Sequence, residues 1–178
     1  MPRNIEIKAR IASIEALLPL AQALADDAPQ VIEQDDTFFA CAHGRLKLRD
    51  FGSGYGELIH YRRVEAEGPS LSDYVRVATD DPAALREALT RAHGVIGRVR
   101  KTRVLLLVGQ TRIHLDRVEH LGDFLELEVV LQEGQPESAA EAIAAELMAQ
   151  LGVSDSQRLA GAYFDLLASS SRGIASAR

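Results

Sequence analysis

Hydrophobic and polar residues alternate in four short segments of the chain. In 4–8 the polar residues alternate with two isoleucines, and 45–49, 111–116 and 124–128 repeat the pattern. Because successive side chains of a β-strand point to opposite faces, each segment predicts a strand with one charged and one apolar face. Further strands are predicted at 31–39, 58–63, 74–78 and 101–108.

Apolar residues at helical spacing occupy the stretches between and after these strands. Ser13 can cap a helix in which Pro19 predicts a kink or a later start. Asp81-Pro82 predicts a second capped helix, because proline is favoured in the first turn. An alanine-rich helix is predicted over 137–151, and a last helix over 154–167.

The charged faces of the alternating strands are sorted by sign. Segment 45–49 carries three cations on one face, whereas 124–128 carries two carboxylates. A sandwich with these faces in water would explain any one strand. The sorting across four strands instead favours a closed barrel with a charged, water-filled interior and helices over its apolar exterior. We therefore expect an α+β fold dominated by an antiparallel sheet.

Length and composition suit a single domain. The chain has 178 residues, 47% of them hydrophobic, and the prediction is one domain over 1–168 with a flexible tail over 169–178. Cys41 is the single cysteine, so no internal disulfide or cysteine-based zinc site is expected. The charged N-terminal segment differs from a signal peptide, and the longest apolar run, 104–108, is far shorter than a membrane helix. We expect a cytoplasmic protein without a membrane partner.

The distribution of charge along the chain changes what the net charge implies about partners. A net charge of −6 argues against nucleic acid as a partner. Residues 45–63 and 98–117, however, carry net charges of +3 and +5, which leaves −14 for the remainder. Two basic segments in an acidic chain predict a bound anion.

Two opposed sets of side chains indicate what the barrel would bind. The carboxylates Glu6, Asp116, Glu126 and Glu128 suit a hard divalent cation such as Mg²⁺ or Mn²⁺, which prefers oxygen ligands. Guanidinium groups match phosphate oxygens bidentately, so the basic set suits a run of phosphates. That set is Arg45, Lys47, Arg49, Arg63, Lys101, Arg103 and Arg112.

The order of these segments resembles a known family. The N-terminal Asn4-Ile-Glu-Ile-Lys8 is similar to the Glu-x-Glu-x-Lys signature of the CYTH family, the triphosphate tunnel metalloenzymes. This family includes class IV adenylate cyclases, thiamine triphosphatases and inorganic triphosphatases. The resemblance continues through the following segments: Gln34-Asp-Asp-Thr-Phe-Phe39, Gly44-Arg-Leu-Lys-Leu-Arg49, Glu57-Leu-Ile-His-Tyr-Arg-Arg63, Lys101-Thr-Arg103, Arg112-Ile-His-Leu-Asp116, Leu121-Gly-Asp-Phe-Leu-Glu-Leu-Glu128 and Tyr163.

The resemblance implies a closed eight-stranded antiparallel β-barrel that binds a small-molecule triphosphate with Mg²⁺ or Mn²⁺. By position, Glu6, Glu126 and Glu128 would hold metal, and Asp116 would hold or orient a second ion. The implied phosphate-binding residues are Lys8, Arg45, Lys47, Arg49, Arg63, Lys101, Arg103 and Arg112, and the candidate catalytic residues are Lys8, Arg49, Lys101 and Asp116.

One position departs from the family signature. Asn4 stands where the signature has its first Glu, so a neutral oxygen replaces a charged metal ligand. The resemblance links that site to water activation in triphosphatases, so the departure favours a class IV adenylate cyclase-like enzyme that converts ATP to cyclic AMP and pyrophosphate. An inorganic or thiamine triphosphatase, a non-catalytic polyphosphate or nucleotide binder, and a plain barrel with solvated charges are the alternatives. A homodimer is compatible with the sequence.

Overall fold

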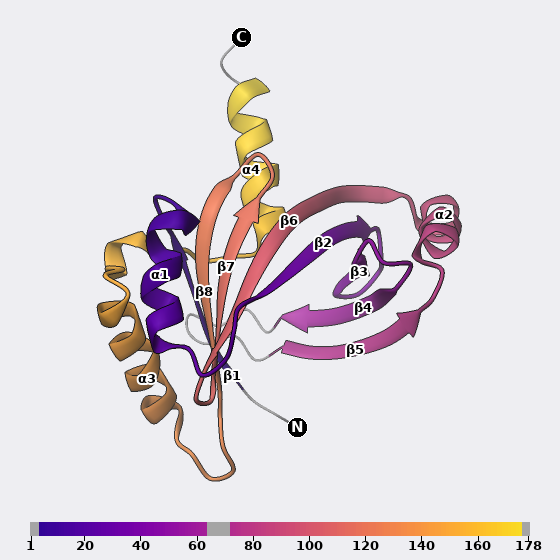
Figure 1. Ribbon diagram of the computed structural model, residues 1–178. Helices are drawn as coiled ribbons and strands as arrows, with labels where there is room; N and C mark the ends of the chain where they lie inside the picture. Colours follow the sequence, from indigo (N-terminus) through magenta and orange to yellow (C-terminus); the bar gives the residue numbers. More distant parts are fainter. Residues whose placement is uncertain (1–3, 64–71, 176–178) are drawn as a thin grey trace.

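One antiparallel sheet organises the computed structural model, which describes residues 4–63 and 72–175 (Figure 1). Within these ranges it has eight strands in the order β1-β8-β7-β6-β2-β3-β4-β5. The strands are β1 (Asn4–Arg10), β2 (Gln30–Phe39), β3 (Arg45–Asp50), β4 (Gly56–Arg63), β5 (Ser72–Thr79), β6 (Val95–Val108), β7 (Thr111–Val118) and β8 (Gly122–Val130). All eight predicted strands are present, and β6 begins earlier than expected.

The helices follow the predicted caps for most of the chain. They are α1 (Ile14–Leu24), α2 (Pro82–His93), α3 (Glu137–Gln150) and α4 (Tyr163–Ala175), with a short 3₁₀ helix at Asp155–Gln157. The Ser13 side chain accepts a hydrogen bond from the Ala16 amide, and α1 starts directly after Ser13 with Pro19 inside it. The Asp81 side chain caps α2 in the same way. None of the described helices is long and apolar enough to span a membrane.

The sheet curves strongly without closing. Strands β1 and β5 are its two edges, and no pairing joins them in the described part of the chain. In Figure 1, β3, β4 and β5 form a lobe that stands apart from β1, β7 and β8. The α+β antiparallel architecture is therefore confirmed, whereas the expected closed barrel is not. Closure would need a register between the first and fifth strands, which alternation within each strand does not determine.

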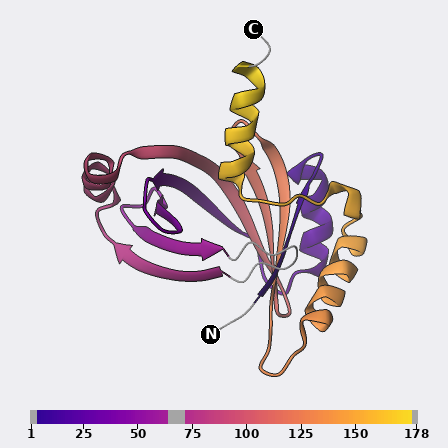
Figure 2. The same cartoon turned by 180° about the vertical axis from the view of Figure 1, so that it is seen from behind.

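Two helices cover the apolar face of one half of the sheet. Figure 2 shows α1 and α3 on the same side of β1, β7 and β8. Their buried residues, such as Leu17 and Leu147, pack with Ile7, Ile113 and Leu127 from the strands. This core explains the predicted apolar faces, because burying each such side chain contributes about 1.5–3 kcal/mol. The charged faces of the same strands therefore point to the opposite side, which we call the interior face.

The last helix begins later than predicted. The predicted helix from Ser154 is interrupted after Gln157, where Arg158 forms a bridge with Ala9 and the Leu159 amide donates to the Lys8 carbonyl. Pairing with the edge of β1 thus replaces helical hydrogen bonding in this segment. Helix α4 then continues to Ala175, beyond the predicted start of the tail at 169, and rises away from the sheet in Figure 1.

A second apolar cluster lies where α4 meets the sheet. Tyr163 packs with Phe38, Val99, Val118 and Phe124, which belong to β2, β6, β7 and β8. These strand residues share the face of the charged side chains, because they are separated from them by even numbers of positions. The first turn of α4 is therefore anchored beside the charged interior face.

Candidate functional site

Charged side chains are buried on the interior face of the sheet. Lys8, Lys101, Arg103, His114 and Asp116 are each no more than 9% exposed. They come from β1, β6 and β7, which are brought together through the order β1-β8-β7-β6. Charged side chains are seldom buried unless they are paired, so the contacts of each one are informative.

Asp116 is the centre of the first group of contacts. Its side chain is fully buried and accepts hydrogen bonds from Lys101 Nζ at 2.9 Å and from Arg103 Nε and Nη2 at 2.7 and 2.6 Å. The Tyr163 hydroxyl donates to Asp116 Oδ2 at 2.9 Å. Burial alone would raise the pKa of Asp116, but Lys101 and Arg103 hold that pKa below its ordinary value.

Glu126 is the second carboxylate of this group. It accepts from Arg103 Nη2 at 3.2 Å, lies 3.1 Å from His114 Nδ1 and pairs with Lys8 Nζ at 3.3 Å. Burial again opposes ionisation, but Arg103, His114 and Lys8 hold the pKa of Glu126 well below its ordinary value. We call Lys8, Lys101, Arg103, His114, Asp116, Glu126 and Tyr163 the Asp116–Glu126 cluster. His114 thus lies on the interior face and contacts Glu126.

Tyr163 connects this cluster to α4. The ammonium groups of Lys8 and Lys101 lie 4.4 and 4.9 Å from the centre of its ring, within the range of cation–π attraction. Burial and the nearby charges of Asp116 and Glu126 raise the pKa of the Tyr163 hydroxyl, so it remains a hydrogen-bond donor. Burial lowers the pKa of Lys101 despite its contact with Asp116.

A second group of ion pairs lies across β2 and β3. Asp36 accepts from Lys47 Nζ at 2.6 Å and from Arg49 Nε and Nη2 at 2.7 and 2.8 Å. We call these three residues the Asp36 cluster. Burial would raise the pKa of Asp36, but Lys47 and Arg49 depress it strongly. Burial lowers the pKa of Lys47 to about 8, against the attraction of Asp36.

Sequence reasoning predicted Lys47 and Arg49 and missed the carboxylate that holds them. Asp36 stands in the predicted strand 31–39, two residues after Gln34 and two before Phe38. The sequence does contain a signal for Asp36. It is an acidic residue that shares its strand face with Gln34 and Phe38, in a strand that ends in aromatic residues. Its partners depend on the pairing of Asp36 with Arg49 across β2 and β3, which joins residues distant in the sequence.

Among the predicted cations whose side chains the structure describes, two lie outside both clusters. Arg45 Nη2 pairs with Asp165 of α4 at 2.7 Å, and its guanidinium lies 5.5 Å from the Phe164 ring. Arg112 Nη1 pairs with Glu128 at 3.1 Å. The side chain of Arg63, at the end of β4, lies outside the described part of the structure.

The carboxylates of β1 and β8 match the ligand chemistry of a hard divalent cation. Glu6 pairs in register with Glu128, and Glu126 lies two residues before Glu128 on the same face. In this structure Lys8 lies 3.6 Å from Glu6, and the Asn4 amide donates to Glu128. Among residues 4–63 and 72–175, no three His, Cys, Asp or Glu side chains gather as a metal site. A bound cation would therefore replace some of these contacts.

Asp116 fits direct metal ligation less well than these glutamates do. Both of its oxygens accept hydrogen bonds from Lys101, Arg103 or Tyr163, and its side chain is fully buried. These contacts suit a residue that positions the side chains of Lys101 and Arg103. That Asp116 holds or orients a second ion stays a prediction from the sequence.

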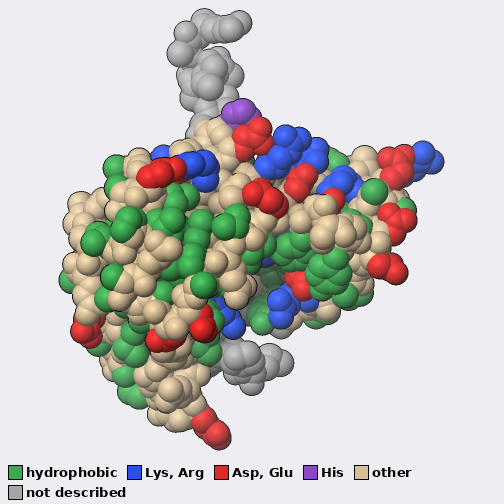
Figure 3. All heavy atoms as spheres, viewed as in Figure 1, with side chains coloured by type: hydrophobic (Ala, Val, Ile, Leu, Met, Phe, Trp, Pro, Cys, Tyr) green, Lys and Arg blue, Asp and Glu red, His purple; other side chains and the backbone are tan. Residues whose placement is uncertain are grey.

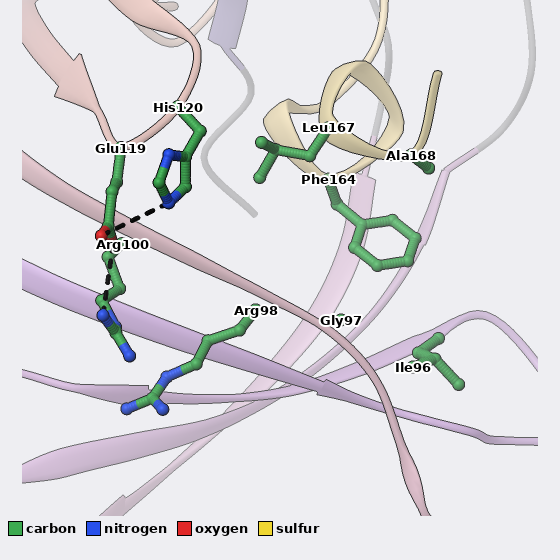
Figure 4. Close-up of a pocket in the computed structure, with 9 residues that line it drawn as sticks. All are labelled: Ile96, Gly97, Arg98, Arg100, Glu119, His120, Phe164, Leu167 and Ala168. Carbon is green, nitrogen blue, oxygen red and sulfur yellow. Dashed lines mark hydrogen bonds and ion pairs between the residues drawn. The ribbon is translucent and has the colours of Figure 1, made fainter. Parts of the chain in front are cut away.

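A cavity of about 390 Å³ beside α4 lies apart from these clusters (Figure 4). Phe164 and Leu167 line one side, and Arg100, Glu119 and His120 line another. Arg100 and His120 are both paired with Glu119. Acidic and basic side chains also lie side by side along the upper edge of the molecule in Figure 3. The charged side chains Arg100, Glu119 and His120 of this exterior cavity thus neutralise one another. We therefore place the candidate site on the interior face of the sheet.

These features define a class of proteins: a curved, eight-stranded antiparallel sheet with helices outside and buried, opposed charges inside. The family model for the CYTH domain matches residues 2–163, so the chain belongs to the CYTH family. No curated protein sequence matches the chain. The resemblance predicted from the N-terminal signature is therefore confirmed at the level of the family.

Solved structures share this fold. The PH1012 protein of Pyrococcus horikoshii has a TM-score of 0.80 and 24% identity, covering 92% of this chain and 99% of its own. A candidate adenylate cyclase of Vibrio parahaemolyticus has a TM-score of 0.69 and 18% identity, covering 93% and 97%. HpAC1 of Hippeastrum, a candidate adenylyl cyclase described with a dominant triphosphatase activity, has a TM-score of 0.68 and 17% identity, covering 96% of both chains.

Proposed function

We propose that this protein is a divalent-metal-dependent enzyme that binds a triphosphate on the interior face of its curved sheet. The observation that carries the proposal is the gathering on this face of Lys101 and Arg103, which are buried, with Lys47 and Arg49, which are partly buried. A core that served stability alone would favour apolar residues, because desolvating an ion costs several kcal/mol. Buried charges with shifted pKa values are typical of functional sites.

Two pairs of basic residues would bind the phosphates. Lys101 and Arg103, held by Asp116, and Lys47 and Arg49, held by Asp36, would present donors in fixed positions. Such fixed donors stabilise developing charge without reorganising during the reaction. Lys8, Arg45, Arg63 and Arg112 complete the proposed set.

The metal would be held by Glu6, Glu126 and Glu128, with Asn4 as a neutral neighbour. Once bound, it would neutralise phosphate charge and polarise a phosphoryl oxygen. In the structure these glutamates contact Lys8, Arg112 and the Asn4 amide. Those side chains would then be free to bind phosphate oxygens, so metal and triphosphate would assemble the site together.

Cyclisation of ATP is the first candidate reaction. The ribose 3′-hydroxyl would attack the α-phosphate and release its proton to solvent, and pyrophosphate would leave with the electrons of the broken P–O bond. The neutral Asn4 supports this choice, because it supplies no charged ligand at the position linked with water activation. The Vibrio neighbour is described as a candidate adenylate cyclase, which agrees with this proposal.

Hydrolysis of a triphosphate is the second candidate. The fold neighbour HpAC1 is described with a dominant triphosphatase activity, so this fold accommodates that reaction. Both reactions use the same phosphate contacts and differ in the nucleophile. A non-catalytic binder would use the contacts without turnover. The cytoplasmic location, the homodimer and the exclusion of nucleic acid also stay predictions.

Paired substitutions on the two faces of the sheet test the proposal. Glu126→Gln and Arg49→Ala should each abolish turnover of ATP or tripolyphosphate in Mg²⁺ or Mn²⁺. Glu119→Gln and Arg100→Ala, which remove charges from an exterior ion pair, should retain it. Full activity in both interior variants would refute the proposed site. Tight binding by the unmodified protein without any product would support the non-catalytic alternative.

A further inference from the structure

Gln34 lies on the interior face between the two ion-pair clusters. It is 6% exposed and shares its face of β2 with Asp36, two residues along the strand. Across the β2–β6 pairing its register partner is Lys101. The intervening Asp35 faces the other way and pairs with Arg98 outside. Gln34 thus stands between the residues that we propose bind phosphate.

The carboxamide of Gln34 has an unused acceptor. Its Oε1 is buried and has no hydrogen-bond partner among the described residues, whereas Asp36 beside it accepts from two cations. Leaving a buried polar atom unpaired costs about 1–3 kcal/mol. An apolar residue of similar size would avoid this cost. The unpaired oxygen therefore indicates a hydrogen-bond donor that comes from outside the chain.

The chemistry of a triphosphate restricts what that donor can be. Ionised phosphate oxygens accept hydrogen bonds and do not donate them, so they do not satisfy a carbonyl oxygen. The positive charge of Lys101, the register partner of Gln34, favours the negative end of the carboxamide dipole toward the site. The attacking water or ribose hydroxyl, in contrast, has a hydrogen to donate and must lie beside the phosphate that it attacks.

We infer that Gln34 is a further catalytic residue, whose side-chain oxygen accepts a hydrogen bond from the attacking water or ribose hydroxyl. The contact orients the nucleophile toward the phosphorus while Lys101 holds the phosphate. Gln34 takes no proton and forms no covalent bond. This inference rests on the proposed function and names the residue that would hold the nucleophile in either candidate reaction.

Steady-state kinetics of Gln34→Met, with ATP and with tripolyphosphate in Mn²⁺, test the inference. The substitution keeps the length of the side chain and removes the acceptor. We expect kcat to fall by about 10–100-fold with KM within about twofold of the unmodified protein, since orientation of the nucleophile is lost while phosphate contacts remain. Thermal stability should stay equal or rise, because an unpaired buried oxygen is removed.

Two further variants control the measurement. Gln30→Met makes the same change at an exposed position of the same strand and should leave kcat unchanged. Gln34→Glu restores an acceptor and should recover part of the lost kcat. A Gln34→Met enzyme with unchanged kcat, or with raised KM alone, would overturn the inference and leave the proposed function standing. Absence of turnover in the unmodified protein would overturn both.

Discussion

At the scale of single residues, burial determines the chemistry of Lys47. Its pKa falls to about 8 because desolvation outweighs the attraction of Asp36, while Arg49 and Lys101 lower it further. The Tyr61 ring lies 5.8 Å from its ammonium group and supplies no full charge. Near neutral pH Lys47 is therefore charged, and at higher pH it loses its proton more readily than an exposed lysine.

This titration predicts a pH dependence of triphosphate binding. The free protein loses the Lys47 proton above pH 8, whereas a bound polyanion favours the charged form. Binding should therefore take up a proton, and the dissociation constant should rise by up to about tenfold per pH unit above pH 8. Isothermal titration calorimetry with ATP and Mg²⁺ between pH 7 and 10 measures both effects.

Lys47→Arg is the control, because arginine stays charged across this range. It removes the titration of residue 47 and leaves that of the ligand unchanged. An equal rise of the dissociation constant with pH in the variant and in the unmodified protein would contradict the role given to Lys47.

Asp36 is expected to matter for stability as well as for binding. Asp36→Asn leaves the partly buried Lys47 and Arg49 without their counter-charge, and removing one partner of a buried pair costs about 3–5 kcal/mol. Asp35→Asn, next to it on the outer face, removes a partly exposed ion pair and should cost at most about 1 kcal/mol. Urea unfolding at pH 7 distinguishes the two variants. Equal losses would show that Asp36 has no special structural role.

At the scale of elements, the first turn of α4 connects a helix with the charged interior face. Tyr163 donates to Asp116, Asp165 pairs with Arg45, and the Phe164 ring packs against Phe38 with 4.7 Å between ring centres. Gly97 of β6 permits this approach. A Cβ atom added there would lie 2.4 Å from Phe164 Cε2, far inside van der Waals contact.

Gly97→Ala should therefore displace the first turn of α4. We expect a loss of about 1–3 kcal/mol in the free energy of unfolding, because overpacking forces side chains and backbone to shift. Turnover should fall too, since Tyr163 loses its position against Asp116 and Lys8. Adding Phe164→Leu makes room for the new methyl group and should recover part of the stability in a double-mutant cycle. Additive losses would contradict this explanation.

Elements with strong local patterns were predictable from the sequence, and those set by distant contacts were not. Alternation identified β1, β3, β7 and β8, and the Asp81-Pro82 pair identified the start of α2. The start of α4 was missed, because Leu159 bonds to β1 and Gly161 has a φ of 92°. For the site, the sequence predicted the cations, whereas the pairing of Asp36 with Lys47 and Arg49 required the β2–β3 register.

At the scale of the whole molecule, an acidic protein gathers paired cations on its interior face. The net charge of −6 combines +8 in the two basic segments with −14 in the remainder, and many exterior cations are paired with acids, as Arg98 is with Asp35. The buried cations meet any anion in a less screened environment than surface groups do. The proposed site would thus bind a small polyanion without a basic exterior.

This arrangement predicts stabilisation by tripolyphosphate. At about 100 times its dissociation constant, a ligand that binds only the folded state adds about 2.7 kcal/mol. For a domain of this size, Tm should rise by roughly 5–10 °C. Sodium chloride at equal ionic strength should give little of this shift, and Lys47→Met combined with Arg49→Ala should remove most of it. An undiminished shift in the double variant would place the anion elsewhere.

Product analysis tests the central claim most directly. The protein is incubated with ATP and, separately, with tripolyphosphate in Mg²⁺ and in Mn²⁺, and the products are identified by mass spectrometry. We predict metal-dependent conversion: cyclic AMP and pyrophosphate from ATP if the protein is a cyclase, or orthophosphate with the shortened chain if it is a triphosphatase. If both substrates are recovered unchanged in Mg²⁺ and also in Mn²⁺, the assignment of an enzyme is contradicted.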